Sequence, residues 1–117
     1  MPKRLHATER WDKEWYQSLS CKHKCFWEYL TSKCDAAGVW EPNYKMASFV
    51  IGEPVTEQDL DVFNGNIRKL DGGKVLLVKF CAFQYGELSE HCKPHASVLK
   101  LIAKHGIAKE VREGYGE

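Results

Sequence analysis

The amino-acid sequence predicts a single α+β domain in which short helices cover one β-hairpin. Gly72 and Gly73 lie between two apolar runs, and paired glycines accept the positive φ angles of a tight hairpin turn. The segments before and after the hairpin repeat apolar residues at helical spacing. With 117 residues, of which 44% are hydrophobic, the chain is long enough to bury one core.

The hairpin is the element around which the rest of the prediction is built. We expect a two-residue turn at Gly72 and Gly73, because that register sets Asp71 opposite Lys74 and avoids the pairing of like charges. In the second arm, the alternation of side chains extends the strand through Ala82. Since this strand is apolar on nearly both faces, helices must cover it.

Two helices and a short strand are predicted at the start of the chain. Trp11 and Trp15 lie one turn apart on a short helix, where we expect both to anchor the core. Ser20 is the N-cap of a longer helix that ends at Gly38. Residues 39–41 are too few for a helix and apolar enough for a short strand.

Two further short helices are predicted before the hairpin. Asn43 caps the first and Gly52 ends it. The residues expected on its buried face are Met46, Phe49 and Val50, with Lys45 and Ser48 facing outward.

The second of these helices runs from Thr56 to Asn64. An acidic residue, Asp59, follows Thr56 at the spacing of a capping box. Leu60 and Phe63 are one turn apart, so we expect both to face inward.

After the hairpin the sequence predicts one last helix. Pro94 suits its first turn, and Gly106 with an apolar residue behind it indicates a Schellman stop. We expect a flexible basic arm at residues 1–9, a folded domain at 10–106 and a flexible tail at 107–117.

The predicted order of elements is helix, helix, short strand, helix, helix, β-hairpin and final helix. Two short helices joined by a tight turn and backed by a hairpin are the elements of a winged helix-turn-helix fold. In DNA-binding proteins of this kind, the second helix of the pair enters the major groove.

Several motifs resemble the N-terminal domain of phage replication-initiation or replisome-organiser proteins. They are AGVWE at 37–41, IG at 51–52, GGK at 72–74 and FQYG at 83–86, together with Leu88, His95 and the tryptophan-rich start. The resemblance covers roughly residues 10 to 106. It implies a winged-helix domain that binds DNA in phage or prophage replication, and relatives of this kind usually continue into a second region for oligomerisation or for recruiting host replication proteins.

The overall charge limits how such a protein can bind DNA. The net charge is +1, so no global basic field attracts a polyanion and any affinity for DNA must come from local patches. The sequence has neither a long apolar run nor a secretory signal, so we expect a cytoplasmic protein, in the host cell if phage-encoded.

The residues predicted to contact double-stranded DNA are polar or basic. Amide side chains on the outward face of the helix at 56–64 can read base edges, and cations around the hairpin turn can bind phosphate. The candidates are Lys45, Gln58, Asn64, Arg68, Lys69 and Lys74.

Acidic residues on the same helix support a different function. Glu57, Asp59 and Asp61 would face or flank the phosphates and oppose DNA binding. The hairpin cations can also serve only to keep an edge strand soluble. The alternative function is therefore a protein-interaction domain, which docks a replication or transcription factor through its acidic third helix.

The cysteines and histidines do not predict a metal site. Cys21, His23 and Cys25, with the downstream run at 91–95, offer zinc-type ligands, but residues two apart on a helix point in different directions. We expect Cys21 and Cys25 on the apolar face as buried thiols. No Walker or dinucleotide motif is present, so the sequence predicts a non-enzyme without a cofactor.

The aromatic residues between 80 and 85 offer a further possible contact with DNA. Phe80, Phe83 and Tyr85 can stack unpaired bases, although core packing is the commoner role of such side chains. In a strand, alternation sets Phe80 on the opposite face from the other two.

Overall fold

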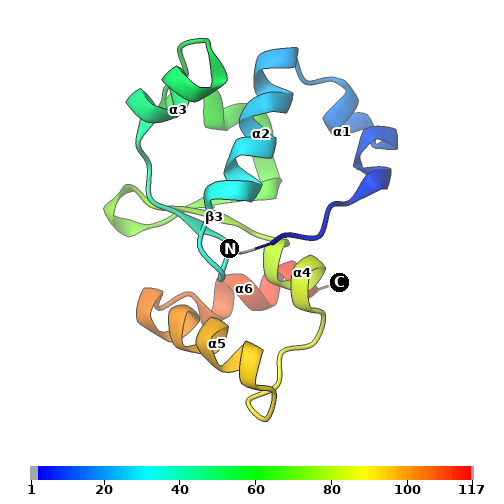
Figure 1. Ribbon diagram of the computed structural model, residues 1–117, viewed down its shortest axis with the longest axis vertical. Helices are drawn as coiled ribbons and strands as arrows, with labels where there is room; N and C mark the ends of the chain where they lie inside the picture. Colours follow the sequence, from blue (N-terminus) through cyan, green and yellow to red (C-terminus); the bar gives the residue numbers. More distant parts are fainter. Residues whose placement is uncertain (1–2, 117) are drawn as a thin grey trace.

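Three short strands form an antiparallel sheet at the middle of the molecule (Figure 1). A computed structural model describes residues 3–116. The strands are β1 (Val39–Trp40), β2 (Ile67–Lys69) and β3 (Val75–Leu77), in the order β1-β3-β2. All three residues of the central strand β3 are buried, so the sheet is covered on both faces.

Helices lie on both sides of this sheet (Figure 1). One side holds η1 (Thr8–Asp12), α1 (Glu14–Gln17), α2 (Cys21–Lys33), α3 (Tyr44–Ile51) and η2 (Glu57–Asn66), where η denotes a 3-10 helix. The hairpin turn contains η3 (Asp71–Gly73), and the other side holds α4 (Phe80–Tyr85), α5 (Lys93–His105) and α6 (Ala108–Tyr115). The α+β class is therefore as predicted.

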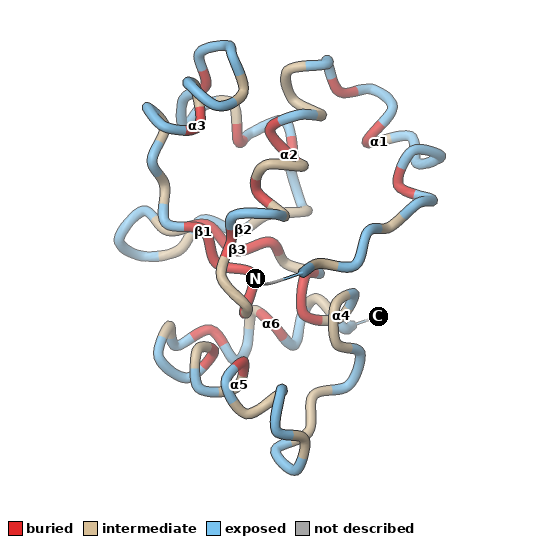
Figure 2. Tube along the Cα trace, in the orientation of Figure 1, coloured by how far each residue is buried: buried red, intermediate tan, exposed pale blue. Residues whose placement is uncertain are grey.

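Aromatic side chains fill the core between α2 and the sheet. Phe26 is fully buried, and its ring lies 5.9 Å from that of Trp40 and 5.7 Å from that of Phe63, measured between centroids. The first pair is edge-on and the second is tilted, and favourable aromatic pairs add about 0.5–1.5 kcal/mol each beyond the burial of their area. Figure 2 shows buried stretches on both α2 and β3, and their buried residues belong to one hydrophobic core that runs from helix to sheet.

A carboxylate joins the two sides of the molecule. Asp35 accepts hydrogen bonds from the backbone N–H groups of Ala37 (2.8 Å) and Val39 (3.1 Å) through Oδ1. Its Oδ2 lies 2.8 Å from Nε2 of His105, a nearly buried residue at the end of α5. The loop that leads into β1 is thereby connected directly to the last long helix.

The hairpin turn has three residues instead of the predicted two. The backbone N–H of Leu70 donates to the carbonyl oxygen of Lys74 at 2.7 Å, so Lys74 pairs with Leu70 and not with Asp71. Gly72 and Gly73 have φ angles of 79° and 84°, as the prediction of a glycine-dependent turn requires. With three residues in the turn, Lys74 lies opposite Leu70 and Lys69 lies opposite Val75, so like charges are not paired although the predicted register is absent.

The second arm of the hairpin ends at Leu77, so the prediction of a strand through Ala82 is wrong. Leu77 pairs with the first residue of β2, and β1 pairs only as far as Leu76. A longer β3 would have no partner on either edge, and its backbone groups would be unsatisfied. Residues 80–85 satisfy theirs within helix α4.

The prediction for the first helix was wrong about its buried residues. Trp11 is 51% exposed, whereas Tyr16 is fully buried. The backbone is extended at Lys13, which separates η1 from α1 and rotates Trp11 away from the core. Trp15 is partly buried and packs against the core.

Helix α2 begins as predicted but ends earlier. The Ser20 side chain accepts a hydrogen bond from the His23 backbone N–H, which confirms the N-cap. The helix ends at Lys33 and not at Gly38. Gly38 has a φ of 88° in the following loop, and a Cβ there would lie 2.7 Å from that of Phe80. This glycine therefore lets α4 approach the loop.

Helix α3 has the predicted bounds but the opposite buried face. Asn43 Oδ1 accepts from the Met46 N–H at 3.0 Å and Gly52 has a φ of 92°, which confirms both ends. Ala47 is fully buried, and Ser48, predicted to face outward, exchanges hydrogen bonds with the backbone of Val55. Small side chains let a helix pack closely on its neighbour. The three residues wrongly predicted to be buried are exposed: Met46, Phe49 and Val50.

The two ends of the described chain pack against the domain. Gly106 is left-handed, and the Ile107 N–H donates to the Ile102 carbonyl at 3.2 Å, as the predicted Schellman stop requires. In place of a loose tail, residues 108–115 form α6, with Val111 buried.

At the N-terminal end of the described chain, Arg4 donates a hydrogen bond to the Cys34 carbonyl at 2.9 Å. Met1, Pro2 and Glu117 lie outside the described residues.

We expect Gly114→Ala to destabilise the protein. A methyl group at this position would overlap the backbone carbonyl of Val78 in the turn after β3. Relief of the overlap would require the main chain of α6 or of the turn to move. The free energy of unfolding should fall by about 1–3 kcal/mol, the usual cost of overpacking. Urea unfolding measures it.

Gly65→Ala is the matched control, because no atom lies within 4 Å of a Cβ built there. Equal loss of stability in the two variants would contradict the close contact between α6 and the turn.

Candidate nucleic-acid interface

Asp59 fixes the start of η2, the helix predicted to read DNA. Its Oδ2 accepts from the Thr56 N–H at 2.7 Å, which confirms the reciprocal half of the capping box. Its Oδ1 lies 2.9 Å from His23 Nε2 and 3.3 Å from Lys22 Nζ on α2. Asp59 therefore faces α2, where its charge is already paired with Lys22.

The ionisation of Asp59 follows from these contacts. Burial alone would raise the pKa of Asp59, but the hydrogen bonds from His23 and the Thr56 N–H, with the Lys22 ammonium group, lower it to about 2. The carboxylate is thus charged at neutral pH and joins η2 to α2.

The amide residues predicted to read base edges are on the surface of η2. Gln58 and Asn64 are both exposed, while Leu60 and Phe63 are fully buried as predicted. Asn64 has φ 52° and ψ −124°, a conformation that L residues rarely adopt, and it marks a kink before β2. Both amides are available to a ligand from opposite ends of the helix.

Lys69, at the end of β2, lies beside the two exposed carboxylates of η2. Its Nζ is 3.3 Å from Asp61 Oδ1 and 3.8 Å from Glu57 Oε2. The cation predicted to bind phosphate therefore already has acidic partners. Exposed pairs contribute only about 0–1 kcal/mol, so a phosphate can replace the carboxylates.

The other two cations of the hairpin are also paired. Arg68 Nη2 lies 2.6 Å from Glu113 Oε1 on α6, and Lys74 Nζ lies 3.8 Å from Glu41 Oε2 after β1. All three hairpin cations thus have carboxylates within 4 Å, which weakens the positive potential around the turn.

Two other lysines are available at this surface. Lys45 on α3 is exposed, and Lys104 on α5 is exposed and lines, together with Lys74, a groove beside the hairpin turn. Neither lysine forms an ion pair with any residue among those described. Sequence reasoning missed Lys104, although the lack of any acidic residue between 93 and 105 was a usable signal.

An apolar patch lies on the exposed face of α3. Phe49 is 84% exposed, and Met46 and Val50 are exposed beside it on the same helix. Glu57 lies near the start of α3, because its charge adds to burial in raising the pKa of the Tyr44 hydroxyl. Helix α3 therefore carries an exposed apolar face, with the Glu57 carboxylate near its first residue.

Two cysteines are exposed, two are buried, and Cys92 is partly buried. Cys21 and Cys25 are exposed, so the prediction that both are buried is wrong. Cys34 and Cys81 are buried, and burial raises the pKa of their thiols to about 12 and about 11. Within residues 3–116, no three His, Cys, Asp or Glu side chains are grouped as a metal site would require.

Comparison with known proteins gave no relative. No protein-family model matches the chain, and no curated protein or solved structure is significantly similar to it. Among the described residues, no helix has the length and apolar character needed to cross a membrane.

We expect Asp59→Asn to reduce stability at neutral pH by about 1 kcal/mol, since an amide is a weaker cap partner and cannot pair with Lys22. The folded pKa, about 2, lies below the ordinary 3.8, so the ionised carboxylate stabilises the native state above pH 3.8. This contribution is lost as the pH falls from about 4 to about 2. When the free energy of unfolding is measured with urea across this pH range, it should fall more steeply for the wild type than for Asp59→Asn.

The matched control is Asp61→Asn, an exposed carboxylate on the same helix. Its stability at neutral pH should change by less than about 0.5 kcal/mol. Identical pH profiles for Asp59→Asn and the wild type would show that the α2–η2 contact does not depend on this charge.

Proposed function

We propose that this protein is a winged-helix domain that binds double-stranded DNA and acts in the initiation of phage or prophage replication. The observation that carries the proposal is the pairing of β1, which lies between α2 and α3, with β3 of the hairpin. This pairing sets the hairpin behind two short helices, α3 and η2, which are joined by a short connection. The order and the pairing are those expected of a winged helix, and the sequence motifs resemble replication initiators.

In this proposal η2 is the recognition helix. Gln58 and Asn64 are exposed on it, and amide side chains can form two hydrogen bonds to adenine in the major groove. The hairpin is the wing, with Arg68, Lys69 and Lys74 as phosphate ligands. Lys45 and Lys104 extend the contact on either side of the wing.

The carboxylates beside the wing limit the affinity for DNA. Each wing cation must exchange a carboxylate for a phosphate, so the gain from each phosphate contact is reduced. Binding is therefore moderate and depends on salt, because each neutralised phosphate adds about −0.9 to the slope of log affinity against log salt.

Removing a carboxylate next to a wing cation should strengthen DNA binding. We expect Glu113→Gln and Asp61→Asn each to raise the affinity for a random duplex by about twofold, which corresponds to a surface ion pair of about 0.4 kcal/mol. Lys69→Glu and Lys74→Glu should abolish micromolar binding. Fluorescence anisotropy of a labelled duplex at two salt concentrations measures both effects.

Glu90→Gln is the matched control, because Glu90 is exposed in the loop before α5 and changes the net charge equally. An equal gain from Glu90→Gln would assign the effect to net charge alone. No binding of the wild type at low salt would overturn the DNA proposal.

The apolar patch on α3 favours a second function. Phe49, Met46 and Val50 are exposed on α3, and Glu57 lies near Tyr44 at the start of the same helix. An apolar surface with a carboxylate near one end fits an amphipathic basic helix of a partner protein. A replication or transcription factor that carries such a helix is the partner class in this alternative.

Cross-linking at Phe49 tests the second function. A photoreactive amino acid at this position should capture, in cells that produce the protein, a peptide with Lys or Arg residues opposite Glu57. The same amino acid in place of Glu90 should not capture it. Capture at both positions, or of a peptide without basic residues, would reject docking on α3.

A further inference from the structure

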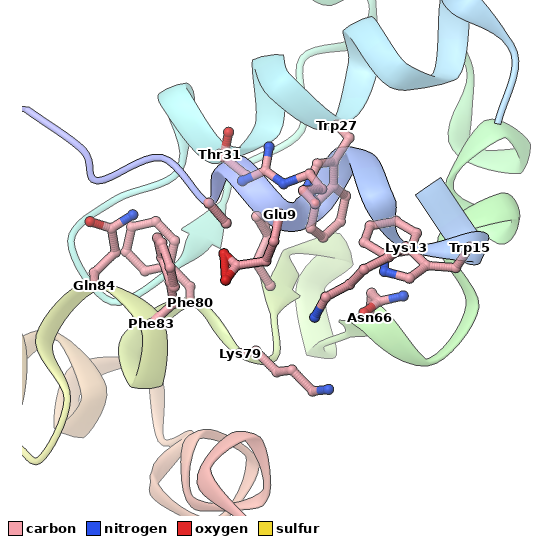
Figure 3. A pocket seen from close by; sticks show the side chains of 13 residues that line it. Glu9, Lys13, Trp15, Trp27, Thr31, Asn66, Lys79, Phe80, Phe83 and Gln84 are labelled. Atoms are coloured by element: carbon pink, nitrogen blue, oxygen red, sulfur yellow. The ribbon is translucent and has the colours of Figure 1, made fainter. Parts of the chain in front are cut away.

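A cavity of about 310 Å³ lies between the N-terminal helices and α4 (Figure 3). Aromatic rings stand on two sides of it. Trp15 and Trp27 come from α1 and α2, and Phe80 and Phe83 from α4. Small-molecule sites range from about 300 to 1,000 Å³, so this cavity has room for one nucleoside-sized ligand.

The helical form of residues 80–85 creates this arrangement. Strand alternation predicted Phe80 and Phe83 on opposite faces, but on α4 they are three residues apart and line the same cavity. Tyr85 points elsewhere, and its hydroxyl donates to the Ala36 carbonyl. Phe80 is nearly buried whereas Phe83 is 43% exposed, so one ring forms the floor and the other the rim.

Exposed charged side chains at the rim of the cavity form no ion pair with any residue among 3–116. Lys13 and Lys79 are exposed and line the cavity, and neither forms an ion pair with a described residue. Glu9 is likewise exposed and unpaired, and Figure 3 shows it between the two groups of rings. Arg10 also lines the cavity, but its guanidinium is bound to Glu28. These ions contrast with the wing cations, all of which have partners.

We propose that this cavity binds one unpaired nucleotide of single-stranded DNA. The base stacks against Phe83 and reaches toward the two tryptophans, since aromatic stacking is the usual means of holding unpaired bases. Lys13 and Lys79 bind its phosphate. The Glu9 carboxylate accepts a hydrogen bond from an exocyclic amino group, as carboxylates do from cytosine N4.

The Glu9 contact implies a base preference. Cytosine and adenine carry an exocyclic amino group and thymine does not, so the site selects cytosine over thymine. A free nucleotide offers the same base and phosphate as a nucleotide within a strand, so both sources fit the chemistry.

This site does not depend on the proposed duplex binding. Figure 1 shows the wing and the region of η1 and α4 at opposite edges of the molecule. A domain with both sites could hold duplex DNA on one edge and a separated strand on the other.

Tryptophan fluorescence provides the test, because two of the tryptophans line the cavity. Titration with a cytidine octamer, (dC)8, should quench the emission saturably, and a thymidine octamer should bind about fivefold more weakly. Phe83→Ala should weaken (dC)8 binding about tenfold, as the loss of one stacking contact does. Lys13→Glu with Lys79→Glu should weaken it at least as much, and Glu9→Gln should remove the preference for cytosine.

Two matched control variants distinguish the loss of cavity contacts from the loss of a phenylalanine or a positive charge elsewhere on the surface. Phe49→Ala removes an exposed phenylalanine on α3, and Lys93→Glu reverses an exposed charge on α5. Both should leave (dC)8 binding unchanged. Displacement by dCMP would assign the site to free nucleotides as well, whereas octamer binding without displacement would assign it to strands.

Two outcomes would overturn the inference: no quenching by either octamer, or equal weakening by Phe83→Ala and Phe49→Ala. The wing variants Lys69→Glu and Lys74→Glu should abolish duplex binding and leave (dC)8 quenching intact. Failure of the duplex proposal can therefore be distinguished from failure of the cavity proposal.

Discussion

The antiparallel pairing of β1 with β3 is the interaction on which the other parts of the structure depend. Val39 pairs with Leu76 and Trp40 with Val75, so the loop after α2 is attached to the hairpin far along the chain. Trp40 then contacts Phe26 of α2, and Asp35, just before the strand, connects to α5. A two-residue strand thereby sets the positions of helices on both sides of the sheet.

Electrostatic pairing divides the surface into two kinds of region. Around the hairpin, each cation lies within 4 Å of a carboxylate from another element, which gives a nearly neutral surface. Around the cavity, Lys13, Lys79 and Glu9 remain without ion pairs among the described residues. A net charge of +1 conceals this difference, because it counts charges without their neighbours.

Local signals in the sequence predicted individual helix caps correctly, but not the end of α2 at Lys33 or the buried face of α3. Ser20, Asn43 and Gly106 act through bonds to residues at most five positions away, so their roles are visible in the sequence. The exposed face of α3 and the end of β3 depend on distant partners, α2 and the other two strands. The candidate contacts Gln58 and Asn64 were found on the surface as predicted, but the carboxylates beside the wing come from separate elements and could not be assigned.

The exposed thiols of Cys21 and Cys25 give this protein a natural attachment point. They lie one helical turn apart on α2, whereas Cys34 and Cys81 are buried and their thiols are protonated at neutral pH. A reagent with two thiol-reactive arms can span such a pair and hold a spectroscopic probe rigidly on the helix. A probe there reports on the orientation of α2, the helix that η2 contacts through Lys22 and His23.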